Sequence, residues 1–136
     1  MTSLLLALML TASAADHQPL GKFKNTYYYY VDEAEYQHYK PNDKLRTPTG
    51  EILALVSNKF RLALDMEGSG KLRDGRMVNY AKVVNRRIRY NVTKHEFGRG
   101  VGNCALVPYR TIAVDPDKIP QGATVKIAET LGMLLP

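Results

Sequence analysis

One aspartate stands out among the residues that could do chemistry, because the chain around it is restricted. In residues 111–116, which read TIAVDP, Ile112 and Val114 point to one face of an expected strand and Asp115 points to the other. Pro116 disfavours the helical region for the residue before it, so Asp115 is held extended at the strand end. A second interpretation is open: a turn aspartate accepts hydrogen bonds from nearby backbone N–H groups.

Other nucleophilic and metal-binding residue types are sparse. Cys104 is the only cysteine, so no disulfide can form within the chain. His17, His38 and His95 are scattered, and none of them pairs at the spacing of metal ligands. We therefore expect no metal site, no organic cofactor and no Cys–His nucleophile pair.

The first fifteen residues differ from the rest of the chain. Residues 1–15, MTSLLLALMLTASAA, carry no charge, contain an apolar run and approach their end with the small residues Ala12, Ser13 and Ala14. This pattern predicts a secretory signal peptide, although its start lacks the usual basic residue; the alternative is a buried N-terminal helix. The apolar run is shorter than the roughly 20 residues that span a bilayer. We expect an exported protein, in the periplasm, outer membrane or cell wall, without a transmembrane span.

Composition and charge narrow the class of partner. The chain has 136 residues, of which 45% are apolar and 24% charged, which suits one folded domain. Its formal net charge of +6 favours anionic partners, although an ordinary basic surface would have the same composition. Residues 85–90, NRRIRY, place basic side chains beside an aromatic one, a pattern found in nucleic-acid binders. Because we expect export, we expect no nucleic-acid partner.

The elements that position these residues are expected to be mostly short strands. Strands are predicted at residues 23–31, 51–56, 77–84, 87–93, 109–114 and 123–128. One helix is predicted at residues 58–67, with Ser57 as its N-cap and Gly68 as the residue that ends it. Residues 32–50, 68–76 and 96–103 are predicted loops, the first with a short helical turn at residues 32–36. This order predicts a small β-barrel or sandwich with one helix beside it.

Three segments resemble a known family. Residues 110–127, RTIAVDPDKIPQGATVKI, look like the signature of the three-aspartate (3D) domain, related to membrane-bound lytic murein transglycosylase A and stationary-phase muralytic proteins. Residues 67–80, EGSGKLRDGRMVNY, and residues 23–29, FKNTYYY, are similar to earlier segments of exported members, in the same order. The resemblance implies a double-psi β-barrel with a short accessory helix over residues 16–136.

The resemblance also implies an activity. The family cleaves peptidoglycan glycan strands without water, leaving a 1,6-anhydro-muramoyl product. One aspartic acid protonates the glycosidic oxygen and then, as a carboxylate, deprotonates the C6 hydroxyl of the sugar. Peptidoglycan is therefore the expected partner of a monomeric protein. The alternative is a glycan-binding or structural barrel without chemistry.

The carry-over of catalytic residues is incomplete. Asp115 matches the first signature aspartate, which makes it a supporting residue. The family's proton donor is expected in a later Asp-x-Gly-Gly segment, and residues 128–136, AETLGMLLP, contain none. We therefore expect the chain to be a fragment of a longer protein, with a barrel that lacks its last strands and with little or no lytic activity.

Four further residues are candidates for the same groove. Glu67 would be a second carboxylate, or a solvated glutamate at a helix end. Thr26 and Tyr28 match groove residues of the family's first strand, with core packing of the tyrosine as the alternative. Arg110 would bind a lactyl or peptide carboxylate through its planar fork, or be an ordinary solvated arginine.

Overall fold

The computed structural model describes residues 18–24 and 27–134. The predicted signal peptide, residues 1–15, and the candidate Thr26 lie outside the described residues. Among the described residues, no helix is long and apolar enough to cross a membrane.

Two small sheets and one α-helix make up the regular structure. The strands are β1 (Val31–Asp32), β2 (Asp43–Arg46), β3 (Ile52–Val56), β4 (Ser69–Lys71), β5 (Met77–Val84) and β6 (Arg87–Thr93), and the helix is α1 (Asn58–Glu67). Short 3-10 helices follow at η1 (Glu33–Tyr36), η2 (Val101–Asn103) and η3 (Ala128–Thr130). One sheet has the strand order β1-β4-β5-β6, and β2 and β3 form the other. A mainly β fold with one short helix is therefore confirmed.

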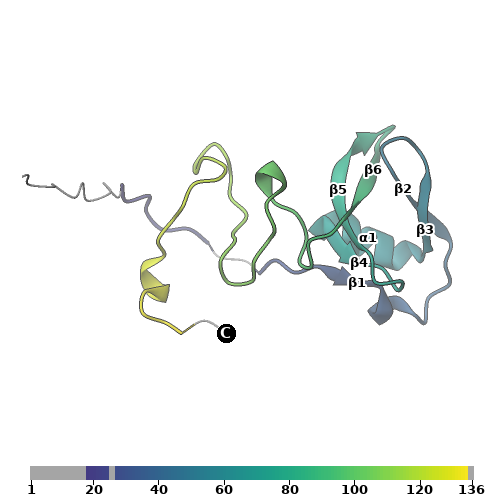
Figure 1. The fold of residues 1–136 in the computed structure, drawn as a ribbon, viewed down its shortest axis with the longest axis horizontal. Helices are drawn as coiled ribbons and strands as arrows, with labels where there is room; N and C mark the ends of the chain where they lie inside the picture. The colour runs from purple at the N-terminus through teal and green to yellow at the C-terminus, as the bar shows by residue number, and fades with distance from the viewer. Residues whose placement is uncertain (1–17, 25–26, 135–136) are drawn as a thin grey trace, which may run out of the picture.

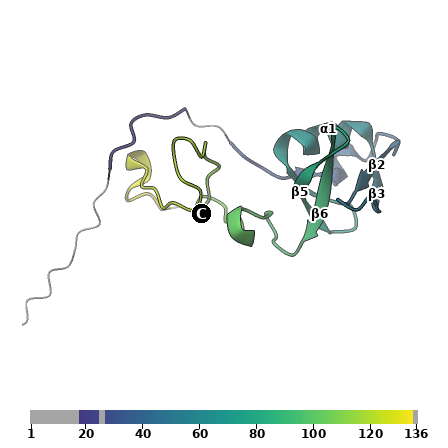
Figure 2. The same ribbon diagram turned by 90° about the horizontal axis from the view of Figure 1, so that it is seen from above.

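The two halves of the molecule differ in kind. Figure 1 shows β1 to β6 and α1 gathered on the right, while the chain after β6, green to yellow, follows an irregular path on the left. The same division is visible from above in Figure 2. The described residues form no closed barrel.

The helix α1 has the predicted bounds and the predicted ends. The Ser57 hydroxyl accepts the N–H of Phe60 at 3.2 Å, which satisfies one of the free donors of the first turn. Gly68 has a φ of 78°, and its N–H donates to the Leu64 carbonyl at 2.8 Å. This left-handed conformation is the reason that a glycine ends the helix.

The β5–β6 hairpin also matches its prediction. The two strands pair antiparallel along their length, with one irregularity between Tyr80 and Lys82. Asn85 and Arg86 make the turn with φ values of 51° and 59°. Two positive φ values are the mark of the type I′ turn, whose twist suits two neighbouring strands.

A single core lies between α1 and the sheets. Phe60 and Leu64 of the helix are fully buried with Val31, Val78 and Tyr90 of the larger sheet. Leu45, Val56 and Leu72 complete the cluster. The apolar side of α1 thus packs against β1, β2 and β4.

Two strands lie where loops were predicted. The predicted loop 32–50 contains η1, close to the expected helical turn, but also β2, which pairs antiparallel with β3. The glycine-rich segment 68–76 contains β4, which pairs parallel with β1. A side chain at Gly70 would lie 2.7 Å from Leu64 Cδ1 and 3.0 Å from the Val31 carbonyl oxygen, so this glycine permits close packing rather than a turn.

Contacts far apart in sequence close this sheet. Val31 and Gly70 are register partners in the parallel pair. Just beyond it, the buried carboxylate of Glu33 accepts the Arg73 N–H at 2.9 Å from 40 residues away. We call the part that holds β1 to β6 and α1 the compact half, and the chain after β6 the irregular half. The start of the compact half is therefore held against the loop between β4 and β5.

Three predicted strands are wrong. Of the predicted strand 23–31, only its last residue lies in a strand among the described positions. Residues 109–114 and 123–128 are irregular. These segments are rich in β-forming residues, but they have no partner strand in the described part of the chain. Strand preference depends on such pairing and packing.

Candidate functional site

Two of the predicted groove residues are neighbours. Glu67 ends α1, Ser69 begins β4, and Tyr28 comes from the segment that leads into β1. Burial raises the pKa of the half-exposed Tyr28, hydrogen bonding with Ser69 lowers it, and the charge of Glu67 raises it, so that the net pKa is above its usual value. Tyr28 therefore lies near Ser69 and close enough to Glu67 to feel its charge.

A buried polar pair supports this surface from beneath. The Asn79 amide donates to the Ser69 hydroxyl at 2.7 Å and to the Arg99 carbonyl at 3.3 Å. Its carbonyl oxygen accepts the Arg99 N–H at 2.9 Å. Gly98 is required here, because a Cβ would lie 2.8 Å from the Ser69 hydroxyl oxygen and its φ is +102°.

A polar hollow of about 210 Å³ opens beside this pair. It is lined by residues of β5, β6 and the loop after them, namely Asn79, Asn91, Val92, Thr93, Lys94, His95, Arg99 and Asn103. The loop is held in place by His95, whose N–H donates to the Thr93 hydroxyl at 3.2 Å and whose Nε2 lies 3.0 Å from the Asn103 carbonyl oxygen. We call this the amide hollow.

The chemistry of this region suits binding. Amide, hydroxyl and cationic groups can exchange hydrogen bonds with the hydroxyls of a polar ligand. Tyr28 and Tyr80, each 47% exposed, flank Ser69 and Gly68 and offer apolar ring faces. Among the described residues, no group of three or more His, Cys, Asp or Glu residues could hold a metal ion.

Asp115 lies elsewhere and has the contacts of a turn aspartate. Its carboxylate accepts the Asp117 N–H at 3.1 Å and lies 3.6 Å from the Lys118 ammonium, while its carbonyl accepts the N–H groups of Lys118 and Ile119. The side chain is exposed. Both views show the segment that follows β6 running away from α1, and these contacts of Asp115 all lie within this segment.

Arg110 belongs to the same irregular segment. Its N–H donates to the Val107 carbonyl at 3.1 Å, and its side chain is exposed. The structure thus supports the solvated alternative for its surroundings and does not bring it to Tyr28 or Glu67.

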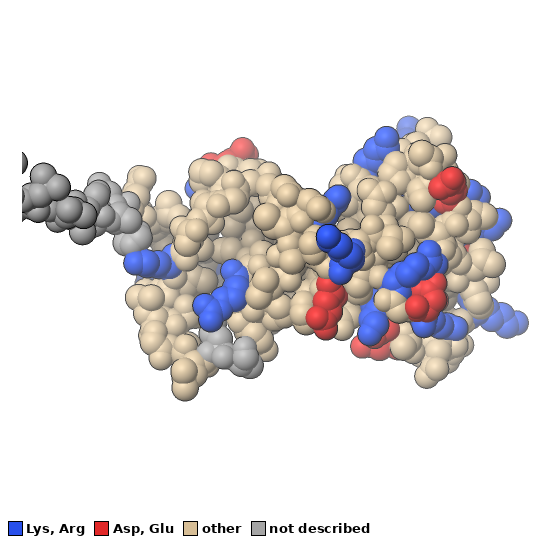
Figure 3. All heavy atoms as spheres, in the orientation of Figure 1, with Lys and Arg blue, Asp and Glu red and all other residues tan. Residues whose placement is uncertain are grey.

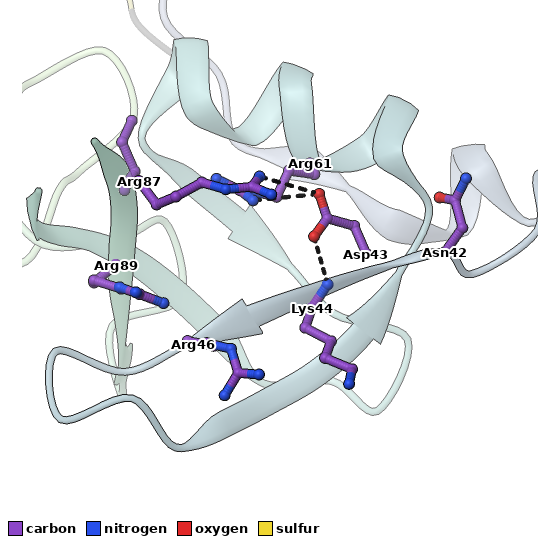
Figure 4. A pocket seen from close by; sticks show the side chains of 8 residues that line it. Asn42, Asp43, Lys44, Arg46, Arg61, Arg87 and Arg89 are labelled. Atoms are coloured by element: carbon purple, nitrogen blue, oxygen red, sulfur yellow. Dashed lines mark hydrogen bonds and ion pairs between the residues drawn. The ribbon is translucent and has the colours of Figure 1, made fainter. Parts of the chain in front are cut away.

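A second, basic hollow lies at the start of β6, whereas the amide hollow lies at its end. It has a volume of about 300 Å³ and is lined by Asn42, Asp43, Lys44, Arg46, Arg61, Arg87, Ile88 and Arg89 (Figure 4). We call it the arginine hollow. Figure 3 shows basic side chains interspersed with acidic ones over the compact half.

An ion-pair network forms one wall of the arginine hollow. Arg61, only 5% exposed, reaches Asp43 at 3.3 Å and Asp65 at 3.2 Å. Arg87 lies 3.5 Å from Asp43. Burial raises the pKa of Asp43, but the hydrogen bond from the Lys44 N–H and the charges of Arg61 and Arg87 outweigh this effect and hold the pKa below its usual value.

Sequence reasoning missed the arginine hollow. The spacing of Arg61 and Asp65, four residues apart on a helix, is a recognisable ion-pair signal. The strand that brings Asp43 and Arg46 to them lies in a segment predicted as a loop, so nothing in the sequence joined them to Arg87 and Arg89.

Comparisons of the chain with family models, with curated proteins and with solved structures give no match.

Proposed function

We propose that the protein is an exported cell-envelope protein that binds peptidoglycan glycan strands at the surface formed by Tyr28, Glu67 and the amide hollow. The observation that carries the proposal is the amide hollow, lined by three asparagine amides, the Thr93 hydroxyl and basic side chains, with Ser69 bonded to its Asn79 and with Tyr28 near Ser69. The resemblance of residues 110–127 to the three-aspartate signature supplies the substrate class.

The chemistry of the site favours binding over cleavage. Lytic transglycosylation needs a carboxylic acid at the glycosidic oxygen. Glu67 has Tyr28 beside it, whereas the Asp115 carboxylate is occupied by Asp117 and Lys118. We therefore assign this chain glycan binding of the three-aspartate type, with Asp115 as a turn residue rather than a proton donor.

We also propose that the two sheets belong to a double-psi β-barrel. In a double-psi β-barrel, the four-stranded sheet and the β2–β3 hairpin would be joined by further strands. The parallel pairing of β1 with β4 is compatible with such an architecture.

Sedimentation with purified murein sacculi tests the proposal. The protein is expected to sediment with sacculi at a salt concentration that screens simple charge attraction, and soluble N-acetylglucosamine oligomers are expected to compete. Mass spectrometry of the supernatant is expected to find no anhydro-muropeptides. Their release would overturn the assignment of binding without cleavage, and failure to sediment would overturn glycan binding itself.

A matched pair of tyrosine variants locates the surface. Tyr28→Ala removes the ring beside Ser69 and Glu67 and is expected to weaken sedimentation about tenfold, the effect of losing one stacked aromatic contact. Tyr27→Ala removes a neighbouring ring that is 94% exposed and is expected to leave binding unchanged. Equal effects of the two variants would place the glycan elsewhere.

A further inference from the structure

The arginine hollow carries more positive charge than its own structure neutralises. Five basic side chains line it, from Lys44, Arg46, Arg61, Arg87 and Arg89, against the single carboxylate of Asp43. Arg61 and Arg87 both pair with that carboxylate, and Arg61 also pairs with Asp65 of α1. This leaves Lys44, Arg46 and Arg89 without a carboxylate partner among the ion pairs of the described residues. The remaining basic groups face a space of about 300 Å³, at the lower end of the range of small-molecule sites.

The fold holds these arginines in fixed positions. Arg87 and Arg89 are two residues apart on β6 and therefore lie on one face of the strand. Arg46 comes from β2, which contacts β6, and its Nη1 donates to the Gly50 carbonyl at 2.7 Å. In Figure 4, Arg87 reaches toward Arg61 and Asp43, while Arg89 and Arg46 lie below it.

One donor in this hollow is unsatisfied. The Nε atom of Arg89 is buried and has no hydrogen-bond partner among the described residues. A buried donor without an acceptor is costly, and such groups in folded proteins call for an explanation. An anion that enters the hollow would supply the missing acceptor once the Arg89 side chain turns its Nε–H toward the open space.

From this we infer that the arginine hollow is a binding site for the phosphoryl group of a phosphoester. Guanidinium groups bind phosphate oxygens in paired, charge-assisted hydrogen bonds. A phosphoryl group offers several oxygens to forks that arrive from two strands at once, whereas a carboxylate offers two. The site is separate from the glycan-binding surface and shares no lining residue with it.

Nitrogen-15 NMR of the whole chain tests the site, with the Arg89 Nε–H signal as the reporter. Inorganic phosphate is expected to shift this signal in a saturable way, and acetate at equal ionic strength is expected to do so at least tenfold more weakly. A signal that phosphate leaves unmoved, or that acetate moves equally well, would overturn the inference.

Three arginine variants separate a built site from general charge attraction. Arg87→Gln removes a lining charge and is expected to weaken phosphate binding about tenfold or more. Arg89→Lys keeps the charge but loses the buried Nε–H, and is expected to weaken binding severalfold, followed through the backbone amides of β6. Arg86→Gln removes the same charge from the neighbouring turn residue outside the hollow, and is expected to change nothing.

Equal weakening by Arg86→Gln and Arg87→Gln would show general attraction and overturn the site. An intact amide spectrum for each variant confirms that it is folded. Glucosamine 6-phosphate and poly(glycerol phosphate) distinguish the source of the phosphoryl group, because the tighter of the two identifies a small phosphoester or a wall polymer. If neither compound binds as tightly as inorganic phosphate, the assignment of the site to a phosphoester fails.

Discussion

Arg61 joins three elements through one buried guanidinium. It extends from α1 to Asp43 on β2 and to Asp65 one turn further along the helix, and Tyr90 of β6 donates its hydroxyl to Asp65. A buried ion pair contributes little net stability by itself, since desolvation offsets the attraction. Removal of one member of such a pair is costly, because the charge of the other member stays buried without a partner.

Replacing Arg61 with methionine is therefore expected to destabilise the protein strongly. The variant leaves Asp43 and Asp65 without their shared partner, and loss of one member of a buried pair costs about 3–5 kcal/mol of the free energy of unfolding. Urea denaturation measures this change. Lys118→Met, which removes the exposed partner of Asp115, is the control and is expected to have no measurable effect. Equal losses in the two variants would contradict the structural role of Arg61.

Tyr90 makes stability depend on alkaline pH. Burial and the hydrogen bond to Asp65 raise the pKa of its phenol, so the folded protein keeps Tyr90 protonated where the unfolded chain ionises it. Its contribution is fully present below the unfolded pKa of about 10 and is lost as pH rises above that value. Urea unfolding at successive pH values should show a smaller alkaline decline for Tyr90→Phe than for the wild type. An unchanged decline would argue against this assignment.

At the scale of elements, prediction succeeded where local signals were complete. The helix α1 has a serine cap, helical spacing and a terminal glycine, and the β5–β6 hairpin has two β-rich runs around Asn85-Arg86. The structure gives both the predicted bounds. β2 and β4 were missed because their residues are mostly polar or glycine. β2 is a strand because it pairs with β3, and β4 also pairs with the distant β1.

Site residues, like strands, could be predicted only where the sequence itself marks them. Tyr28 and Glu67 were selected by resemblance, and the parallel pairing of β1 with β4 brings their segments together. Asn79 and Arg99 could not be selected, because only the folded chain places the loop after β6 against β5. The amide and arginine hollows both depend on such contacts between distant segments.

Gly70 tests the tight packing between α1 and β4. In Gly70→Ala the new methyl group would meet Leu64 and the Val31 carbonyl, and overpacking of this kind typically costs about 1–3 kcal/mol. Thermal or urea denaturation should therefore show a clear loss of stability. Lys71→Ala, at the exposed neighbouring position, should be nearly neutral. A stable Gly70→Ala variant would mean that the helix and the strand lie further apart.

At the scale of the whole molecule, burial is concentrated in one half. The core cluster lies between Val31 and Tyr90, whereas Ile119 is the buried apolar residue of the described chain beyond residue 98. Backbone hydrogen bonds of residues 107–133 connect neighbours within a few positions. The irregular half therefore has little of the long-range packing that resists local opening.

Limited digestion with trypsin should reflect this division. Cleavage is expected first after exposed basic residues of the irregular half, namely Arg110, Lys118 and Lys126, because these sites open without disrupting the core. Basic residues in α1, β5 and β6 should be cut later. Mass spectrometry of early fragments gives the order. First cuts within the hairpin would contradict the division.

The parallel pairing of β1 with β4 has a consequence for the order of folding. The two hairpins join neighbouring segments, whereas the Glu33–Arg73 contact beside the parallel pair closes a loop of 40 residues. Long loops close late because their closure sacrifices chain entropy before any contact compensates for it. We expect pulsed hydrogen exchange during refolding to protect β5 and β6 before Val31 and Gly70. The segment that carries Tyr28 would then reach Ser69 and Glu67 last, so the proposed glycan-binding surface would be completed only at the final step of folding.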